Sequence, residues 1–334
     1  MHIAVLGVGA TGSRVARQLV STEGVERVTV VDRIADRARL VAESLASNVR
    51  IECAEPRAWA DLGADVIVVA TDVGSHRAAA TEAREAGAHV VSLSDDPEEV
   101  QSLLAMDEAF RHEGLVLAVG AGFSPGLSCV LAAHGARTFD AVDEVHIARV
   151  GTGGRACARQ QRRAMRRDAT DWIDGSWVSC QAGSGRELCW FPDPIGARDC
   201  YRADLSEARL LQPAIDGVTR VTARLASTRR ERWMSRLFLP LSLEDRDRLG
   251  ALRVEIRGLR DGRRETTVFG VIDRPAVAAG VVAAVAAVWA GEGRLHDGGA
   301  KGMASLVDTT PFLGELAHRG VKAAVFTGTN EVVA

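Results

Sequence analysis

Three glycines near the start of the chain have the spacing of a turn that can hold a phosphate group. Gly7, Gly9 and Gly12 follow an apolar run and precede a helical pattern. In a dinucleotide-binding turn the first glycine makes the tight bend, the second lets the backbone approach a pyrophosphate, and the third lets the helix pack on the strand. The free N–H groups of that helix favour the phosphates. The sequence therefore predicts cofactor contacts from Gly7, Gly9, Ala10, Thr11 and Gly12.

A second apolar run ends on Asp32, 20 residues after Gly12. A carboxylate at this place can accept a hydrogen bond from a ribose 2′-OH, which favours NAD and would repel a 2′-phosphate. Arg33 can stack on adenine or bind that phosphate. We therefore predict NAD as the cofactor, with NADP left open. A glycine turn that binds nothing is the alternative, but strand, turn, helix, strand and acid all occur in order.

Further loops should meet the cofactor, because ligands of parallel sheets bind at the carboxyl ends of the strands. These loops follow the apolar runs at residues 64–70, 88–93 and 115–119. In the last of these loops, Gly120 and Gly122 let the backbone come close to the cofactor, and the ring of Phe123 can contact the nicotinamide. The predicted cofactor contacts are Thr71, Asp72, Val73, Ser92, Gly120, Gly122 and Phe123.

Ser124, Pro125 and Gly126 are predicted to open a helix that runs to about Arg137, with Ser124 as the N-cap and Pro125 in the first turn. The positive end of this helix would point into the crevice. We expect these three residues to bind a substrate carboxylate or a developing negative charge.

Candidates for a proton carrier are few. His76 follows the loop at residues 71–75 and is the best-placed histidine, although it could instead cap a helix. His146 lies on a predicted strand, where packing or solvent exposure is the simpler interpretation. Asp95 and Asp96 follow a strand end, so one could bind a substrate amine, while capping of the helix at Pro97 is the alternative.

Seven arginines lie between Arg149 and Arg167. A substrate carboxylate would need one or two of them in bidentate geometry, and we name Arg149 and Arg159 for this role. Arg159 shares a helix face with Arg162, Arg163 and Arg166. The alternative is a solvated face or a dimer contact. The histidines are scattered and no cluster of ligands has metal spacing, so no metal is predicted.

These residues need a scaffold of alternating strands and helices. Residues 1–120 alternate throughout, which predicts a Rossmann-type, doubly wound parallel sheet. The helix of residues 96–112 is expected to be continuous. Strand-like runs with longer gaps follow, predicting an inserted α+β substrate or dimerisation domain with an antiparallel sheet. The predicted divisions are a cofactor domain at 1–123, the inserted domain at 124–295, and a segment at 296–334 that folds back on the first domain.

The bulk properties limit the partners. The chain has 334 residues, 47% hydrophobic and 25% charged, with a net charge of −3, which argues against nucleic acid. No signal pattern is present, and the apolar run at residues 276–291 is short for a membrane span. The six cysteines form no CxxC pair and fit reduced thiols in a cytoplasm. We therefore expect a cytoplasmic protein with a small-molecule substrate and no membrane partner.

Several stretches together resemble the saccharopine dehydrogenase-like oxidoreductases. The resemblance implies an NAD(P)-binding domain, an inserted substrate domain, hydride transfer at an amine or imine carbon, and a homodimer. The chain departs from the family at residues 151–180, which are rich in arginine, and this affects the substrate more than the reaction class. The resembling stretches are GVGATG, TDVGSH, GAGFSPGLS, FPDPIGARDCYRADLSE and GGAKGMASLVDTTPFLGELAHRG.

Three functions are therefore considered. The first is an NAD(P)-dependent oxidoreductase acting at the C–N bond of an amino acid or derived imine. The second is an enzyme of the same architecture acting at a C–O bond of a sugar or hydroxy acid. Sugar oxidoreductases of this shape usually carry a Glu-Lys-Pro motif where this chain reads SLSDDP without a lysine. The third is a cofactor-bound sensor without turnover.

Overall fold

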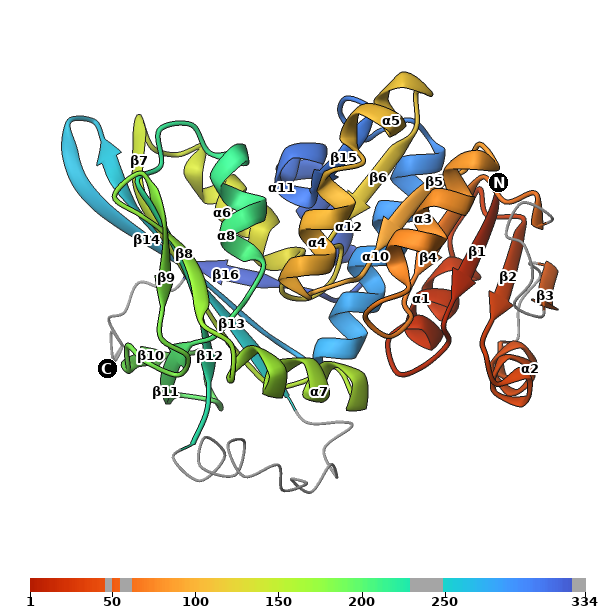
Figure 1. The fold of residues 1–334 in the computed structure, drawn as a ribbon, viewed down its shortest axis with the longest axis horizontal. Coiled ribbons are helices and arrows are strands. Elements are labelled where there is room, and N and C mark those ends of the chain that lie inside the picture. The colour runs from red at the N-terminus through yellow and green to blue at the C-terminus, as the bar shows by residue number, and fades with distance from the viewer. Residues whose placement is uncertain (46–49, 55–61, 229–248, 326–334) are drawn as a thin grey trace.

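The computed structural model describes residues 1–45, 50–54, 62–228 and 249–325. Within these residues the chain builds two sheets that lie side by side (Figure 1). The first is parallel throughout and has seven strands in the order β15-β6-β5-β4-β1-β2-β3. Its strands are β1 (His2–Leu6), β2 (Arg27–Val31), β3 (Arg50–Ala54), β4 (Val66–Val69), β5 (His89–Ser92), β6 (Val116–Val119) and β15 (Gly299–Gly302).

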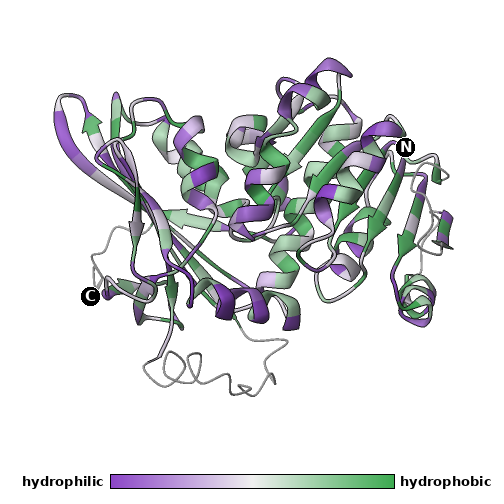
Figure 2. Cartoon of the chain, in the orientation of Figure 1, coloured by the Kyte–Doolittle hydropathy of each residue, from purple (hydrophilic) through white to green (hydrophobic). Residues whose placement is uncertain are grey.

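The predicted doubly wound sheet is thus confirmed, and its central strands are buried along their whole length. Continuous apolar runs suit such strands because helices cover both faces; Figure 2 shows them in green. The covering helices are α1 (Gly12–Leu19), α2 (Ala35–Ser44), α3 (His76–Glu85), α4 (Pro97–Leu104), α5 (Asp107–His112) and α10 (Pro275–Gly291).

The continuous helix predicted for residues 96–112 is wrong. The chain makes α4 and α5 instead, separated at Ala105 and Met106. Asp107 starts the second helix, and its carboxylate accepts a hydrogen bond of 2.9 Å from the backbone N–H of Ala300 on β15. The break therefore lets α5 pack on the edge strand of the sheet.

The second sheet has nine strands in the described residues, with a path of β10-β11-β12-β7-β13-β14-β16 and with β8 and β9 beside β12. It is antiparallel except for β7 and β12, which run parallel, so the prediction of an antiparallel sheet holds only in part. Two of these strands, β8 and β11, were not recognised from the sequence. The strands are β7 (Ala141–Val150), β8 (Ala169–Ile173), β9 (Ser176–Cys180), β10 (Glu187–Trp190), β11 (Ala197–Arg202), β12 (Arg220–Ala226), β13 (Gly250–Arg260), β14 (Arg263–Asp273) and β16 (Ala323–Val325).

The remaining helices cover this sheet and join it to the first. α6 packs on β13 and also contacts α8, α11 and α12. α7 carries the arginine-rich segment and is the most hydrophilic helix at the lower edge of Figure 2. These helices are α6 (Leu127–Ala136), α7 (Arg155–Ala164), α8 (Glu207–Leu211), α11 (Met303–Leu306) and α12 (Thr309–His318), with the short 3-10 helix η2 (Gln212–Ala214).

The predicted start of α6 at Ser124 is wrong. The helix begins at Leu127, and its N-cap is Gly126 with a φ of 123°. The peptide bond between Ser124 and Pro125 is cis. A Cβ on Gly126 would overlap the backbone of Gly122, whose N–H donates to the carbonyl of Pro125. Residues 122–126 therefore form a compact loop, which frees the Ser124 side chain for another contact.

The C-terminal part of the chain divides between the two sheets. β15 extends the first sheet, whereas β16 pairs with β14 of the second. Between them, Phe312 of α12 packs edge-to-face on Trp289 of α10 with ring centroids 5.1 Å apart. α10 itself contacts α1, β4 and β5 of the first sheet. The C-terminal segment predicted at residues 296–334 is described only as far as Val325, the last residue of β16; residues 326–334 lie outside the described residues. None of the described helices is both long and apolar enough to cross a membrane.

The contact between α1 and α10 gives a first test. A Cβ on Gly280 of α10 would lie 2.6 Å from Cβ of Arg14 on α1. The substitution Gly280→Val should therefore push the helices apart and lower the free energy of unfolding by about 1–3 kcal/mol. The measurement is the midpoint of urea unfolding.

The matched control is Gly314→Ala in α12. Nothing lies within 4 Å of a Cβ at this exposed position. This variant should gain about 0.5–1 kcal/mol, because alanine favours helix more than glycine does. An unchanged midpoint for Gly280→Val would show that α1 and α10 can separate without cost.

Candidate functional site

A cavity of about 370 Å³ lies between the two sheets. Its walls are the carboxyl ends of β4 and β5, the loop after β6, the end of β7, and α7. This is the size of a small-molecule site, and the place is where parallel sheets bind ligands. The residues predicted from sequence that line it are Thr11, Thr71, Asp72, Val73, His76, Gly122, Phe123, Ser124, Pro125, Arg149 and Arg159.

The other predicted site residues are outside the lining. Some belong to the neighbouring glycine turn or the end of β2, and others support the walls. A Cβ on Gly120 would lie 2.9 Å from Cγ of Pro125, so packing of the loop explains this glycine without a ligand. The predicted residues that do not line the cavity are Gly7, Gly9, Ala10, Gly12, Asp32, Arg33, Ser92, Gly120 and Gly126.

The glycine turn fits a dinucleotide pyrophosphate. Gly7 has a φ of 83°, and a Cβ there would lie 2.8 Å from the carbonyl oxygen of Ala70. A Cβ on Gly12 would overlap the carbonyl of Gly7. At Gly9 nothing lies within 4 Å of an added Cβ, so the backbone faces open space there. The three glycines thus have the three requirements expected of a pyrophosphate turn, and α1 starts at Gly12.

Asp32 is nearly buried, with a relative exposure of 5%. Its carboxylate accepts from the N–H of Val8 at 3.0 Å and from the N–H of Ile34 at 2.9 Å. Arg37 Nη1 lies 3.3 Å from both of its oxygens. These contacts use the four lone-pair positions of a carboxylate. A ribose hydroxyl would therefore replace Arg37 at one of them.

His76 is buried at the start of α3. Its Nδ1 lies 2.9 Å from the Ser92 hydroxyl, and its Nε2 lies 3.2 Å from the carbonyl oxygen of Thr71. Burial lowers the pKa of this imidazole. A neutral ring that donates from Nε2 and accepts at Nδ1 satisfies both contacts. The position thus suits a residue that holds the loop after β4.

Glu99 of α4 supports the same loop and was not identified from the sequence. Its Oε1 accepts from the N–H groups of Gly74 and His76 at 2.8 and 3.0 Å, and its Oε2 accepts from the Ser94 hydroxyl at 2.7 Å. The sequence does not single out this glutamate, because an acid in the first turn stabilises a helix whether or not it also supports a neighbouring loop.

Asp95 and Asp96 have different roles. Asp96 caps α4 by accepting from the N–H groups of Glu98 and Glu99, each at 3.1 Å. Asp95 lines the cavity instead. The sequence left this choice open, and the cap geometry decides it.

Asp95 is a carboxylate in a buried charged cluster. Its Oδ2 lies 3.7 Å from Nη2 of Arg149 on β7. Burial raises the pKa of Asp95 to about 6, Arg149 opposes the rise, and the charges of Glu207 and Asp96 add to it. The Cys157 thiol of α7 faces the same group, and burial raises its pKa. Asp95 thus has the pKa of a group that exchanges protons near neutral pH.

Glu207 is the second residue that the sequence did not single out. It is fully buried at the start of α8, and its Oε1 accepts from the Ser124 hydroxyl. The carbonyl of Ser124 accepts from Arg149 Nη1. Among the described residues, Glu207 Oε2 and Arg149 Nε are buried without a hydrogen-bond partner. The predicted substrate residues Ser124 and Arg149 therefore lie together, beside an acid that is distant in sequence.

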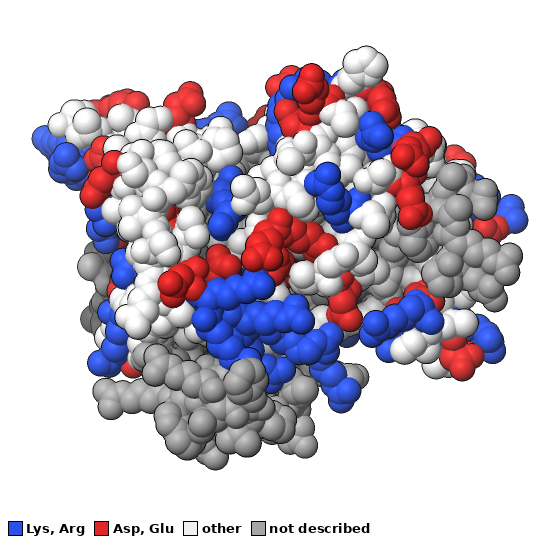
Figure 3. All heavy atoms as spheres, viewed as in Figure 1, with Lys and Arg blue, Asp and Glu red and all other residues white. Residues whose placement is uncertain are grey.

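The arginines of the segment at 149–167 separate in space. Arg149 lies at the buried end of the cavity, whereas Arg159 and Arg163 of α7 line its mouth. Arg159 Nη2 lies 3.0 Å from Oδ1 of Asp72. Arg167 pairs with Asp96 and Glu98 at 3.6 and 3.4 Å. Figure 3 shows a broad basic band over α7.

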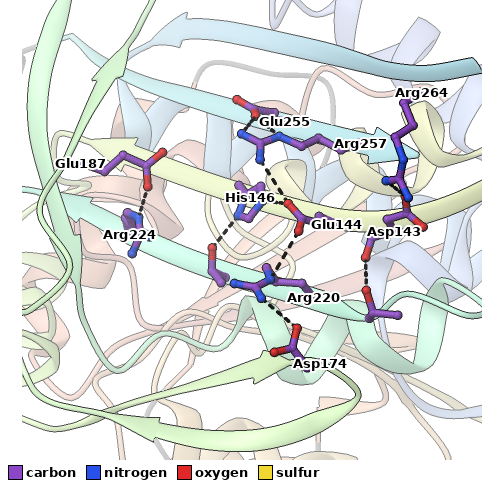
Figure 4. Close-up of polar contacts among 12 residues, drawn as sticks. Asp143, Glu144, His146, Asp174, Glu187, Arg220, Arg224, Glu255, Arg257 and Arg264 are labelled. Atoms are coloured by element: carbon purple, nitrogen blue, oxygen red, sulfur yellow. Dashed lines mark hydrogen bonds and ion pairs between the residues drawn. The ribbon is translucent and has the colours of Figure 1, made fainter. Parts of the chain in front are cut away.

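A second charged network covers one face of the second sheet (Figure 4). His146 Nε2 lies 2.9 Å from Oε2 of Glu144, which also pairs with Arg220 and Arg257. None of these residues lines the cavity. The predicted non-catalytic position of His146 agrees with this geometry. Trp172 and Trp177 do not line the cavity either; their rings pack on each other within the β8–β9 hairpin, with centroids 5.1 Å apart.

Comparison with known proteins supports the fold and the cofactor domain. Residues 3–111 match the TrkA-N domain, an NAD(P)-binding domain. The fold is similar to saccharopine dehydrogenase (L-Glu forming) from Saccharomyces cerevisiae, with a TM-score of 0.72 and 14% identity over 97% of this chain and 99% of that one. The predicted fold class and the prediction of an NAD(P) cofactor are therefore confirmed.

Two further structures share the fold at lower similarity. The DAP dehydrogenase of C. glutamicum, solved in complex with DAP, has a TM-score of 0.54 and 15% identity over 96% of this chain and 99% of that one. The amine dehydrogenase of Mycobacterium smegmatis has a TM-score of 0.54 and 14% identity over 92% of this chain and 96% of that one. At these identities the likeness concerns the fold.

His76 gives the test for this subsection. The substitution His76→Leu removes the partners of Ser92 and Thr71 and should cost about 1–3 kcal/mol of stability. Because burial lowers the His76 pKa below 6.5, the folded chain binds fewer protons than the unfolded chain below that pH. The stability from His76 is complete above pH 6.5 and declines as the pH falls.

The difference in unfolding midpoint between wild type and His76→Leu should therefore shrink from about pH 7.5 to about pH 5.5. The control is His112→Leu, since this histidine is exposed at the end of α5. A difference that stays constant with pH would contradict a buried neutral imidazole.

Proposed function

We propose that this protein is an NAD(P)-dependent oxidoreductase that acts at the C–N bond of a carboxylate-bearing amino acid or of a derived imine. The observation that carries the proposal is Asp95, which lines the cavity next to the cofactor turn with 18% of its side chain exposed, 3.7 Å from Arg149, and whose pKa is raised to about 6. When bound, the nicotinamide supplies or accepts the hydride. The protein must then supply alignment and one proton.

Asp95 is the proposed proton carrier. In imine reduction its protonated form donates to the substrate nitrogen, and in amine oxidation its carboxylate accepts that proton. A pKa near the working pH favours both directions. Arg149 positions this carboxyl. Its charge lowers the pKa of Asp95, whereas the charge of Glu207 raises it.

The substrate class rests on charge and on the relatives. Arg149 places a guanidinium at the buried end of the cavity, and arginine suits a carboxylate. The similar folds include dehydrogenases named for saccharopine, DAP and amines. A small-molecule substrate in a homodimeric, cytoplasmic enzyme is the corresponding proposal for the whole protein.

The reaction is tested by following NADH and NADPH oxidation with a panel of 2-oxo acids, with and without ammonia or primary amines. Oxidation that depends on the amine supports the C–N assignment. NADH or NADPH oxidation at the same rate without any amine would favour the C–O alternative. Tight cofactor binding with no turnover across the panel would favour a sensor.

The first prediction for this function concerns Asp95→Asn. The variant should lose about 10²–10⁴-fold in kcat, because the proton carrier is gone. In amine oxidation the wild type should lose activity as the pH falls below about 6, where Asp95 becomes protonated. In the variant, activity should not fall in this way at acid pH (the acid limb of the pH–rate profile), while NADH should bind as it does to the wild type.

Asp96→Asn is the matched control for Asp95→Asn. Asparagine caps a helix about as well as aspartate, so α4 is retained. This variant should keep a fall in activity at acid pH, moved to a lower pH because one charge that raises the pKa of Asp95 is gone. If Asp95→Asn also keeps it, another group carries the proton.

The second prediction concerns the choice of cofactor. NADH should bind more tightly than NADPH, because the carboxylate of Asp32 can accept a hydrogen bond from the ribose 2′-OH of NADH and repels the 2′-phosphate of NADPH. Isothermal titration of the wild type measures both dissociation constants. Asp32→Asn should narrow the difference, and tighter binding of NADPH by the wild type would contradict the prediction.

A further inference from the structure

The arginine-rich helix α7 remains without a role in the proposed reaction. It belongs to the second domain, yet its first turn lies against the cofactor turn of the first. A Cβ on Gly154 would lie 2.9 Å from Cβ of Ala10, and one on Gly153 would lie 3.7 Å from Oγ1 of Thr11. Gly154 has a φ of 132°. Gly154 therefore allows the start of α7 to approach the glycine turn closely, and Gly153 lies in ordinary contact distance of Thr11.

Arg159 lies five residues after Gly154, which is about 7.5 Å along an α-helix. Its guanidinium pairs with Asp72 in the loop after β4, and both residues line the cavity with Thr11. The side chain of Arg159 is 49% exposed, so its contacts can change without unfolding the helix. It thus reaches across the mouth of the cavity from the second domain to the first.

The charges at this mouth do not balance. Asp72 is shared, since Arg33 Nη2 lies 3.5 Å from its other oxygen. Arg163, one turn after Arg159, also lines the cavity, and among the described residues it has no ion-pair partner. The Asp72 carboxylate is therefore shared by two guanidinium groups, and the guanidinium of Arg163 lines the same cavity. A ligand with two negative charges would complete this arrangement.

We propose that Arg159 of the second domain binds the pyrophosphate of the dinucleotide, which is then held between the glycine turn and α7. This inference rests on the proposed cofactor binding and adds a phosphate ligand from outside the Rossmann domain. The sequence suggested Arg159 for a substrate carboxylate. Its ion pair with Asp72, the cavity that it lines together with Thr11, and the contact between the start of its helix and the glycine turn favour the pyrophosphate, while Arg149 lies beside Asp95.

Titration calorimetry on the full chain tests this. NADH, NADPH and ADP-ribose all carry the pyrophosphate, and adenosine carries no phosphate. Arg159→Gln should raise the dissociation constants of the first three by about tenfold, as for the loss of one charge-assisted hydrogen bond. Adenosine should bind equally to both proteins. Arg159→Lys should lie between, because it keeps the charge and loses the planar fork.

The control is Arg166→Gln, an exposed arginine after α7 that does not line the cavity, and it should leave all constants unchanged. The proposal is overturned if Arg159→Gln binds all three ligands as the wild type does. It is also overturned if only NADPH weakens, which indicates the 2′-phosphate, or if only the KM of the amine substrate rises. A wild type that binds neither NADH nor NADPH overturns the proposed function itself.

Discussion

The contact between Asp95 and Arg149 connects the two halves of the molecule. Asp95 follows β5 of the first sheet and Arg149 lies on β7 of the second; Arg149 is buried, and Asp95 is largely buried with 18% of its side chain exposed. Burying a charge is costly unless a partner is close, so either group alone would destabilise the fold. Glu207 adds a second carboxylate to the same guanidinium. The sheets therefore have to meet at this place, and the cavity is formed where they do.

The same cluster fixes the loop before α6. Arg149 donates to the carbonyl of Ser124, and the Ser124 hydroxyl donates to Glu207. The hydroxyl and the backbone carbonyl of Ser124 are thus both held by side chains of the second domain. Burial is the main cause of the raised pKa of Asp95; Arg149 opposes the rise and the charge of Glu207 adds to it. The residues that hold this loop therefore also surround the carboxyl whose pKa is raised.

Local patterns predicted the first sheet well and the second less well. Strands buried on both faces need continuous apolar runs, and such runs can be recognised in one sequence. β8 and β11 mix polar and apolar residues because one side of each is partly solvated, so neither was recognised. The parallel pairing of β7 with β12 depends on the path of the chain between them. The break between α4 and α5 depends on Asp107 and a strand that arrives near the C-terminus.

The sequence by itself determined the glycine turn, the acid at the end of β2 and the alternation of strands and helices in residues 1–120, because these depend on residues close together in the chain. Only the tertiary structure decided that Asp96 caps a helix while Asp95 lines the cavity, and that Arg37 occupies the carboxylate of Asp32. It also separated Arg149 from the arginines of α7. The physical reason is that burial and charge at a site are set by neighbours from other elements, and one sequence does not specify their distances.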